Sequence, residues 1–101
     1  MKLVLNKAIG SCFDLSATAA DRLCERKGWN RSAWLTQDEM TRRIRTLRRS
    51  DEDLIDIVES LGPSAAGARA ELAIVDIPDG CNWKISDAVG FEFIEVNGKI
   101  F

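Results

Sequence analysis

Residues 50–78 read SDEDLIDIVESLGPSAAGARAELAIVDIP, and this stretch decides the fold. Ser50 with Asp53 three residues later is a capping-box pattern, which predicts the start of a helix because the Ser oxygen can accept from a free backbone N–H group. The apolar residues that follow recur at helical spacing and predict one buried stripe: Leu54, Ile57, Val58 and Leu61. Gly62 followed by Pro63 is typical of a helix end.

Apolar runs with strand character lie on both sides of this helix in the sequence. Residues 71–77 form one run that stops at Pro78, and residues 2–5 form another near the N-terminus. A continuous apolar run is typical of a strand that is covered on both faces. We therefore expect residues 2–5 to be buried.

The C-terminal third predicts strands joined by tight turns. Residues 82–86 and 91–96 have strand composition, and a turn sequence separates them. Asn97 with Gly98 is the strongest short hairpin signal and returns the chain through residues 99–101. Three aromatic residues at strand spacing are expected in the core, with an exposed interface patch as the alternative: Trp83, Phe91 and Phe93.

A second clear helix lies nearer the N-terminus. Ser16 is a good N-cap for a helix over residues 17–27, and Gly28 follows as a stop. With this helix and the one after Ser50, the sequence predicts a single α+β domain over residues 1–101. We expect two main helices packed on one face of a four- to five-stranded, mostly antiparallel sheet.

The segment between those two helices allows two interpretations. Thr36 with Glu39 is a further capping-box pattern and predicts a helix. Residues 41–48 also suit a strand at a sheet edge, where arginines discourage unwanted pairing. We expect helix through about Arg43 and extended chain after it.

The bulk composition is that of an ordinary globular domain. The chain has 101 residues, of which 46% are hydrophobic and 30% are charged. No apolar run approaches the length of a membrane helix, and the first run is too short for a signal peptide. We therefore expect a cytoplasmic protein that does not bind membranes, and free thiols rather than disulfides at Cys12, Cys24 and Cys81.

The charge is divided unevenly along the chain. Residues 1–50 carry eleven Lys or Arg and five Asp or Glu, whereas residues 51–101 carry three and eleven. One interpretation is that the two halves pack together and neutralise each other. The other is that the first half presents a basic surface to an anionic partner.

Two missing residue types narrow the expected chemistry. The chain contains no His and no Tyr. The absence of His removes Ser-His and Cys-His nucleophile pairs and nearly all zinc sites. Cys12, before a helix N-terminus, is the one nucleophile candidate, and it has no neighbouring base. We therefore expect a protein that is not an enzyme and that holds no metal or cofactor.

The loop after the first strand is one candidate binding site. It runs into a helix N-terminus, where backbone N–H groups and the helix dipole favour a phosphate or carboxylate. The residues that would contribute to this anion site are Lys7, Gly10, Ser11 and Ser16. The alternative is an ordinary turn from strand to helix, since no Gly-x-Gly-x-x-Gly or P-loop pattern is present.

A run of arginines is the second candidate site. Five of the eight residues 42–49 are Arg, and two tryptophans precede them. Arg binds phosphate or carboxylate through two parallel hydrogen bonds, and Trp offers a stacking face. The residues predicted to bind a partner are Trp29, Arg31, Trp34, Arg42, Arg43, Arg45 and Arg48. The alternative is a solvated edge whose arginines, Arg49 included, meet Asp51, Glu52 and the acidic second half.

Three blocks of the sequence share their order and spacing with a known family. The first lies within residues 2–16, as residues 2–6 and 13–16. The second is residues 49–62, with Arg-x-Asp-x-x-Leu and Glu-x-Leu-Gly patterns. The third lies within residues 70–92, as residues 70–79 with an Ile-Pro-Asp strand end, 83–85 and 90–92. In these blocks the chain resembles small proteins encoded by bacteriophages and prophages, a family without an assigned activity. The family's Gly-Gly-Phe-x-Leu-Ser loop is replaced here by Gly10-Ser-Cys-Phe13. The resemblance implies a phage or prophage origin and a setting in the host cytoplasm.

These observations predict a phage accessory protein that acts by non-enzymatic binding. The expected target is a host protein, including one that serves host defence, or a small anionic ligand such as a nucleotide. The alternative is a nucleic-acid-binding regulator that uses residues 42–49. A homo-oligomer is also compatible with an edge strand and exposed tryptophans.

Overall fold

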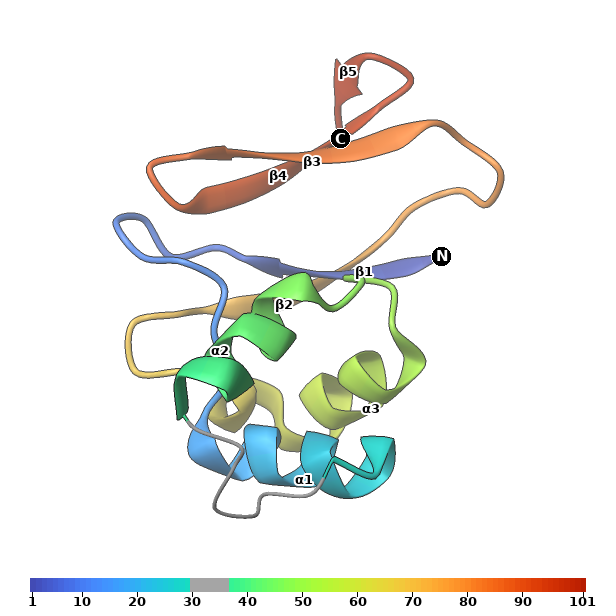
Figure 1. Cartoon of the computed structure of the whole chain (residues 1–101). Helices are drawn as coiled ribbons and strands as arrows, with labels where there is room; N and C mark the ends of the chain where they lie inside the picture. Colours follow the sequence, from blue (N-terminus) through green and yellow to red (C-terminus); the bar gives the residue numbers. More distant parts are fainter. Residues whose placement is uncertain (30–36) are drawn as a thin grey trace.

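The computed structural model describes residues 1–29 and 37–101, which fold into layers of helices and strands (Figure 1). The helices of this part are α1 (Ala17–Lys27), α2 (Gln37–Thr46) and α3 (Glu52–Leu61), and a short 3-10 turn, Gly62–Ala65, follows α3. The strands are β1 (Lys2–Asn6), β2 (Leu72–Asp76), β3 (Trp83–Ala88), β4 (Phe91–Val96) and β5 (Lys99–Ile100). The α+β class predicted from the sequence is therefore confirmed.

The arrangement of the strands differs from the single sheet that we expected. β1 pairs with β2 in one antiparallel sheet, and β3, β4 and β5 pair in that order in another. Figure 1 shows the β1–β2 sheet between the helices and the β3–β4 hairpin. The described strands thus form two stacked sheets. α2 is a third helix, in addition to the two main helices that were expected.

β1 is covered on both of its faces. Val4 packs into the helical core, whereas Leu3 and Leu5 face the other way and pack against Ile94 of β4. Leu3, Val4 and Leu5 have no exposed surface. The continuous apolar run predicted this burial, but it did not indicate that the second covering layer would be another sheet.

The helix ends follow the predicted signals with one correction. Ser16 caps α1 by accepting from the Ala19 N–H, and Gly28 ends it in the left-handed conformation. α3 begins one residue later than expected, because the Asp51 carboxylate rather than the Ser50 hydroxyl accepts from the Leu54 N–H. Asp is as good an N-cap as Ser, so the two neighbouring residues compete and the local sequence does not decide between them.

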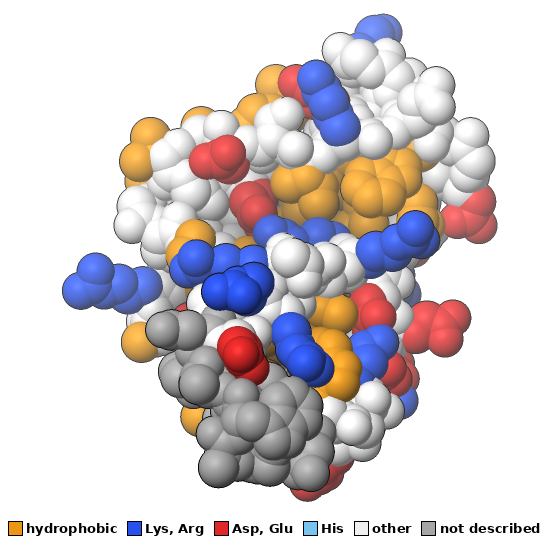
Figure 2. All heavy atoms as spheres, in the orientation of Figure 1, with side chains coloured by type: hydrophobic (Ala, Val, Ile, Leu, Met, Phe, Trp, Pro, Cys, Tyr) orange, Lys and Arg blue, Asp and Glu red, His pale blue; other side chains and the backbone are white. Residues whose placement is uncertain are grey.

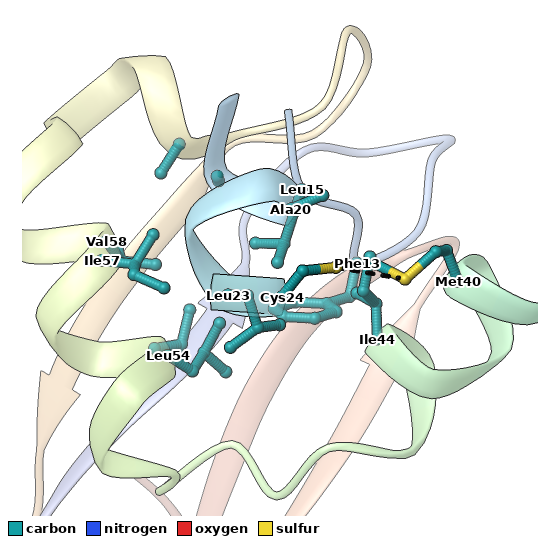
Figure 3. Packing of buried hydrophobic residues seen from close by; sticks show 13 residues of the cluster. Phe13, Leu15, Ala20, Leu23, Cys24, Met40, Ile44, Leu54, Ile57 and Val58 are labelled. Atoms are coloured by element: carbon teal, nitrogen blue, oxygen red, sulfur yellow. Dashed lines mark hydrogen bonds between the residues drawn. The ribbon is translucent and has the colours of Figure 1, made fainter. Parts of the chain in front are cut away.

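α2 continues through Thr46, so the edge-strand interpretation of residues 41–48 is wrong. Met40 and Ile44, one helical turn apart, are both buried. Figure 3 shows them directed toward α1, where the Cys24 Sγ lies 3.5 Å from the Met40 Sδ. Two apolar side chains at this spacing hold a short helix against the core even though the rest of it is polar.

The aromatic residues of the hairpin divide between its two faces. Trp83 packs on the inner cluster with Ile94, as expected. Phe91 and Phe93 alternate with Ile94 along β4, so they lie on the opposite, outer face, and neither belongs to a core cluster. The prediction that Phe91 and Phe93 form part of the core is therefore wrong.

The turn of the β3–β4 hairpin is fitted against the loop that follows β1. Its two central residues, Val89 and Gly90, both have positive φ, 51° and 88°. The Gly10 N–H donates to the Val89 oxygen at 2.6 Å. A Cβ atom at Gly90 would lie 1.9 Å from the Ser11 backbone oxygen, so the close approach requires glycine.

This contact predicts unequal costs for two glycine substitutions. Gly90→Ala should lower the free energy of unfolding by about 3 kcal/mol, since it combines a left-handed residue with a backbone clash. Gly98→Ala is the matched control, because Gly98 has a similar φ of 83° but open space around it. Its cost should be about 1 kcal/mol. Urea denaturation measures both, and equal losses would contradict the packed turn.

Candidate binding site

Three arginines of the run 42–49 extend into solvent from α2 and the residues after it. Arg42, Arg45 and Arg48 are exposed and follow one another at intervals of three residues. Met40 and Ile44 hold the other side of α2 in the core, which directs Arg42 and Arg45 outward, and Arg48 follows two residues after the helix ends. Figure 2 shows basic side chains spread in a belt across the middle of the molecule. We call Arg42, Arg45 and Arg48 the arginine face.

The arginine face forms no ion pair with any residue that the structure describes, whereas Arg26 and Lys27 at the end of α1 are paired. The Lys27 Nζ lies 2.6 Å from the Asp51 carboxylate and 3.0 Å from that of Asp53. Arg26 lies 3.2 Å from Asp53 as well. One interpretation of the sequence gave Asp51 to the arginine run, but in the structure its cationic partner is Lys27.

Lys27 and Asp51 hold each other in their charged forms. Hydrogen bonds to Asp51 and then to Asp53 raise the pKa of Lys27 above its ordinary value. Burial alone would raise the pKa of Asp51, but hydrogen bonds from Lys27 and from the Leu54 N–H outweigh it, and the pKa is lowered overall. The Lys27–Asp51 pair links the end of α1 to the start of α3. The charge of Lys27 therefore has a structural role.

Arg43 and Trp29 adjoin the arginine face. The Arg43 guanidinium lies 5.3 Å from the centre of the Trp29 ring, within cation–π range. Trp29 packs against the helical core, and its backbone N–H donates to the backbone oxygen of Cys24 at 3.0 Å. Arg31 and Trp34, which the sequence also predicted to bind a partner, lie outside the described residues.

Arg45 also borders a hollow of about 370 Å³ between α2, the loop after β1 and the hairpin turn. The Arg45 Nη2 lies 3.3 Å from the sulfur of the exposed Cys12. Across the hollow, the Asp87 carboxylate accepts from the Gly90 N–H at 3.2 Å. A small polar molecule in this hollow would meet a guanidinium, a thiol and a carboxylate.

The Arg49–Glu92 ion pair also lines the hollow. The Arg49 Nη1 and Nη2 donate to the two oxygens of Glu92 at 2.6 and 2.8 Å. Arg49 also lies 3.8 Å above the Phe13 ring, and its Nη1 donates to the Val4 oxygen at 3.2 Å. Although Arg49 belongs to the same sequence run as the arginine face, its contacts are structural.

The residues of the predicted anion site do not converge on one point. Ser16 is occupied as the cap of α1, and its hydroxyl donates to the Ser64 oxygen at 2.7 Å. The Lys7 Nζ donates to the backbone oxygen of Glu92 at 2.8 Å and lies over the Phe91 ring. Gly10 contacts the hairpin turn, and Ser11 borders the hollow. Of this set, Ser11 is the residue that lies beside Arg45.

Sequence reasoning did not find the acidic side of the hollow. Asp87 and Glu92 are separated from Arg45 and Arg49 by about forty residues, and no local pattern relates them. The one usable signal was the opposite charge of the two halves of the chain. That signal predicts contact between the halves, but it does not identify which residues meet.

Comparison of the sequence and structure with protein-family models, with curated proteins and with solved structures gave no match. Among residues 1–29 and 37–101, no three His, Cys, Asp or Glu side chains are grouped so that they could hold a metal ion. None of the described helices has the length and apolar character needed to cross a membrane.

The Arg49–Glu92 pair predicts a large cost when one partner is removed. Glu92→Gln should lower the free energy of unfolding by about 3 kcal/mol, because it leaves the Arg49 charge largely buried without its counterion. Only 16% and 12% of these two side chains are exposed. Denaturant unfolding monitored by circular dichroism measures the change.

A matched control for this variant is Glu59→Gln, which breaks the exposed Lys2–Glu59 pair. The free energy of unfolding should stay nearly unchanged there, since exposed pairs contribute little. If Glu92→Gln lowered the free energy of unfolding as little as this control, the Arg49–Glu92 pair would not stabilise the fold as we expect.

Proposed function

We propose that this protein acts by binding an acidic partner through the arginine face. The observation that carries the proposal is the contrast in charge pairing within one helical layer. Arg26 and Lys27 on α1 are paired with aspartates, whereas the exposed Arg42, Arg45 and Arg48 have no described acidic partner. Unpaired guanidinium groups at regular spacing are suited to carboxylates or phosphates of another molecule.

The support of α2 favours recognition by a preformed surface. Met40 and Ile44 fix the helix against the core, so the arginine face needs no folding step before it binds. Less conformational entropy is then lost on association than with a disordered basic segment. The hollow beside Arg45 adds a place for one acidic side chain or small anion of the partner.

The partner that we propose is a host protein with an acidic surface. This choice rests on the resemblance of residues 2–16, 49–62 and 70–92 to small phage and prophage proteins. In that setting the protein would be an accessory factor in the host cytoplasm, and a protein of host defence is one target of suitable kind. The function proposed is binding without catalysis.

Nucleic acid is the second candidate partner. Arg43 stacked near Trp29, beside the arginine face, combines a cation with an aromatic ring as single-strand-binding surfaces do. The formal net charge of −2 opposes a long polyanion, because nearby acids would repel its phosphates. We therefore rank nucleic acid below an acidic protein.

The double variant Arg42→Glu/Arg45→Glu tests the proposal. Immobilised wild-type and variant proteins are exposed to lysate of a bacterial host, and captured proteins and nucleic acids are quantified. We expect one host protein to be retained by the wild type and at least tenfold less by the variant, because two attractive contacts become repulsive. Fluorescence anisotropy with a labelled single-stranded oligonucleotide tests the second candidate.

The matched control is Arg22→Glu/Arg69→Glu, which makes the same charge change at two exposed arginines elsewhere. It should retain the partner as the wild type does. Equal losses in both double variants would show that retention follows net charge and not the arginine face. Unchanged retention in Arg42→Glu/Arg45→Glu would reject the proposal.

A further inference from the structure

No described helix or strand covers the outer face of the β3–β4–β5 sheet, although Phe91 and Phe93 are half-buried and the Lys7 ammonium lies 4.6 Å from the centre of the Phe91 ring. Ile94 and its neighbours face β1, and the residues that alternate with them face away from the protein. Figure 1 shows the β3–β4–β5 sheet as the outermost layer of the fold, with β5 projecting beyond the hairpin. The side chains of this outer face are Lys84, Ser86 and Ala88 on β3, Phe91, Phe93 and Glu95 on β4, and Ile100 on β5.

The two long strands of this face are complementary to each other in size. Across the hairpin, the small Ser86 is opposite the large Phe93, and the small Ala88 is opposite the large Phe91. The small side chains of β3 therefore form a shallow row on this face, and the large side chains of β4 form a raised row beside it. A flat partner would leave gaps above the small residues.

The same two strands are complementary in charge. Lys84 on β3 is opposite Glu95 on β4, with 3.1 Å between the ammonium and the carboxylate. The Lys84 side chain is 70% exposed, so its charge remains accessible. Each β3–β4 pair on the outer face thus joins unlike side chains. Two pairs join a small residue to a large one, and the third joins a positive residue to a negative one.

We propose that this face binds a second copy of the same chain. A two-fold axis that runs along the strands, between β3 and β4, exchanges the two rows. Phe91 and Phe93 of each copy then lie over Ala88 and Ser86 of the other, and each Lys84 lies over the other Glu95. The two sheets would pack at the usual distance of about 10 Å, as in a β-sandwich.

The size of the face determines the expected strength of the dimer. The two six-residue strands present an area about 20 Å long and about 10 Å wide, and the two-residue β5 widens it at one end only. This is smaller than the interface of a permanent dimer. The association should therefore depend on concentration, with a dissociation constant in the micromolar range. The exposed Ile100 at its border, 74% accessible, would add apolar contact.

Charge reversal tests this geometry without disturbing the core. Lys84→Glu and Glu95→Lys each place like charges opposite each other in a dimer, so each variant alone should dimerise roughly tenfold more weakly than the wild type. An equimolar mixture of the two should recover dimer formation, since every cross-copy contact is again between unlike charges. Neither mixed chain regains its internal Lys84–Glu95 pair, so recovery reports the interface and not monomer stability. Sedimentation equilibrium measures the masses.

Two further variants separate this face from other surfaces. Ala88→Glu adds a charge under the partner's Phe91 and should abolish the dimer, whereas Ile9→Glu changes another exposed residue, outside the sheet, and should not. A wild-type protein that is monomeric up to millimolar concentration contradicts the proposal, and so does a mixture of the two charge variants that stays monomeric.

If Ala88→Glu instead removes a heterologous partner from a monomeric wild type, the dimer proposal is wrong and the face binds that partner. The arginine-face variants should leave the dimer intact, so this proposal and the proposed function can fail independently.

Discussion

The groups that satisfy the second edge of β1 hold the layers of the fold together. β1 pairs with β2 along one edge only, so the N–H and C=O groups of its other edge need partners inside the protein. The Arg49 backbone oxygen accepts from the Val4 N–H at 3.0 Å, and a Glu92 oxygen accepts from the Asn6 N–H at 2.6 Å. The ion pair between Arg49 and Glu92 then joins the two groups that close the edge. One polar cluster thus connects the segment after α2, the central sheet and the outer hairpin.

This cluster separates the roles of adjacent arginines. Arg49 turns inward to Glu92, while Arg48 and Arg45 remain in solvent. The inward residue fixes the position of the chain at the end of α2, and the outward ones stay accessible. Asn6 supports the same region from within, because its buried side chain donates to the Gly90 oxygen and accepts from the Glu71 N–H. The hollow beside Arg45 is therefore bounded by groups that the fold itself holds in place.

The sequence predicted local structure well where a feature depends only on a residue and its immediate neighbours in the chain. Ser16 and Gly28 bounded α1, and Asn97 with Gly98 formed the predicted turn, because caps and tight turns depend on immediate neighbours. It failed where the outcome depended on distant partners. The stacking of β3 and β4 on β1, and the outward position of Phe91 and Phe93, follow from which face of each strand meets Leu3 and Leu5. The candidate site divides in the same way: the exposure of Arg42 and Arg45 follows from the spacing of Met40 and Ile44, but the pairing of Arg49 with Glu92 required the fold.

Amide hydrogen exchange at β1 distinguishes a closed second edge from an open one. Alternate residues of an antiparallel strand face its partner, so the amides of Leu3 and Leu5 face β2, while those of Val4 and Asn6 face the other edge. If Arg49 and Glu92 close that edge, the Val4 and Asn6 amides should exchange as slowly as their neighbours, through opening of the whole fold. Fast exchange of Val4 and Asn6 beside slow exchange of Leu3 and Leu5 would show an open edge and contradict the account.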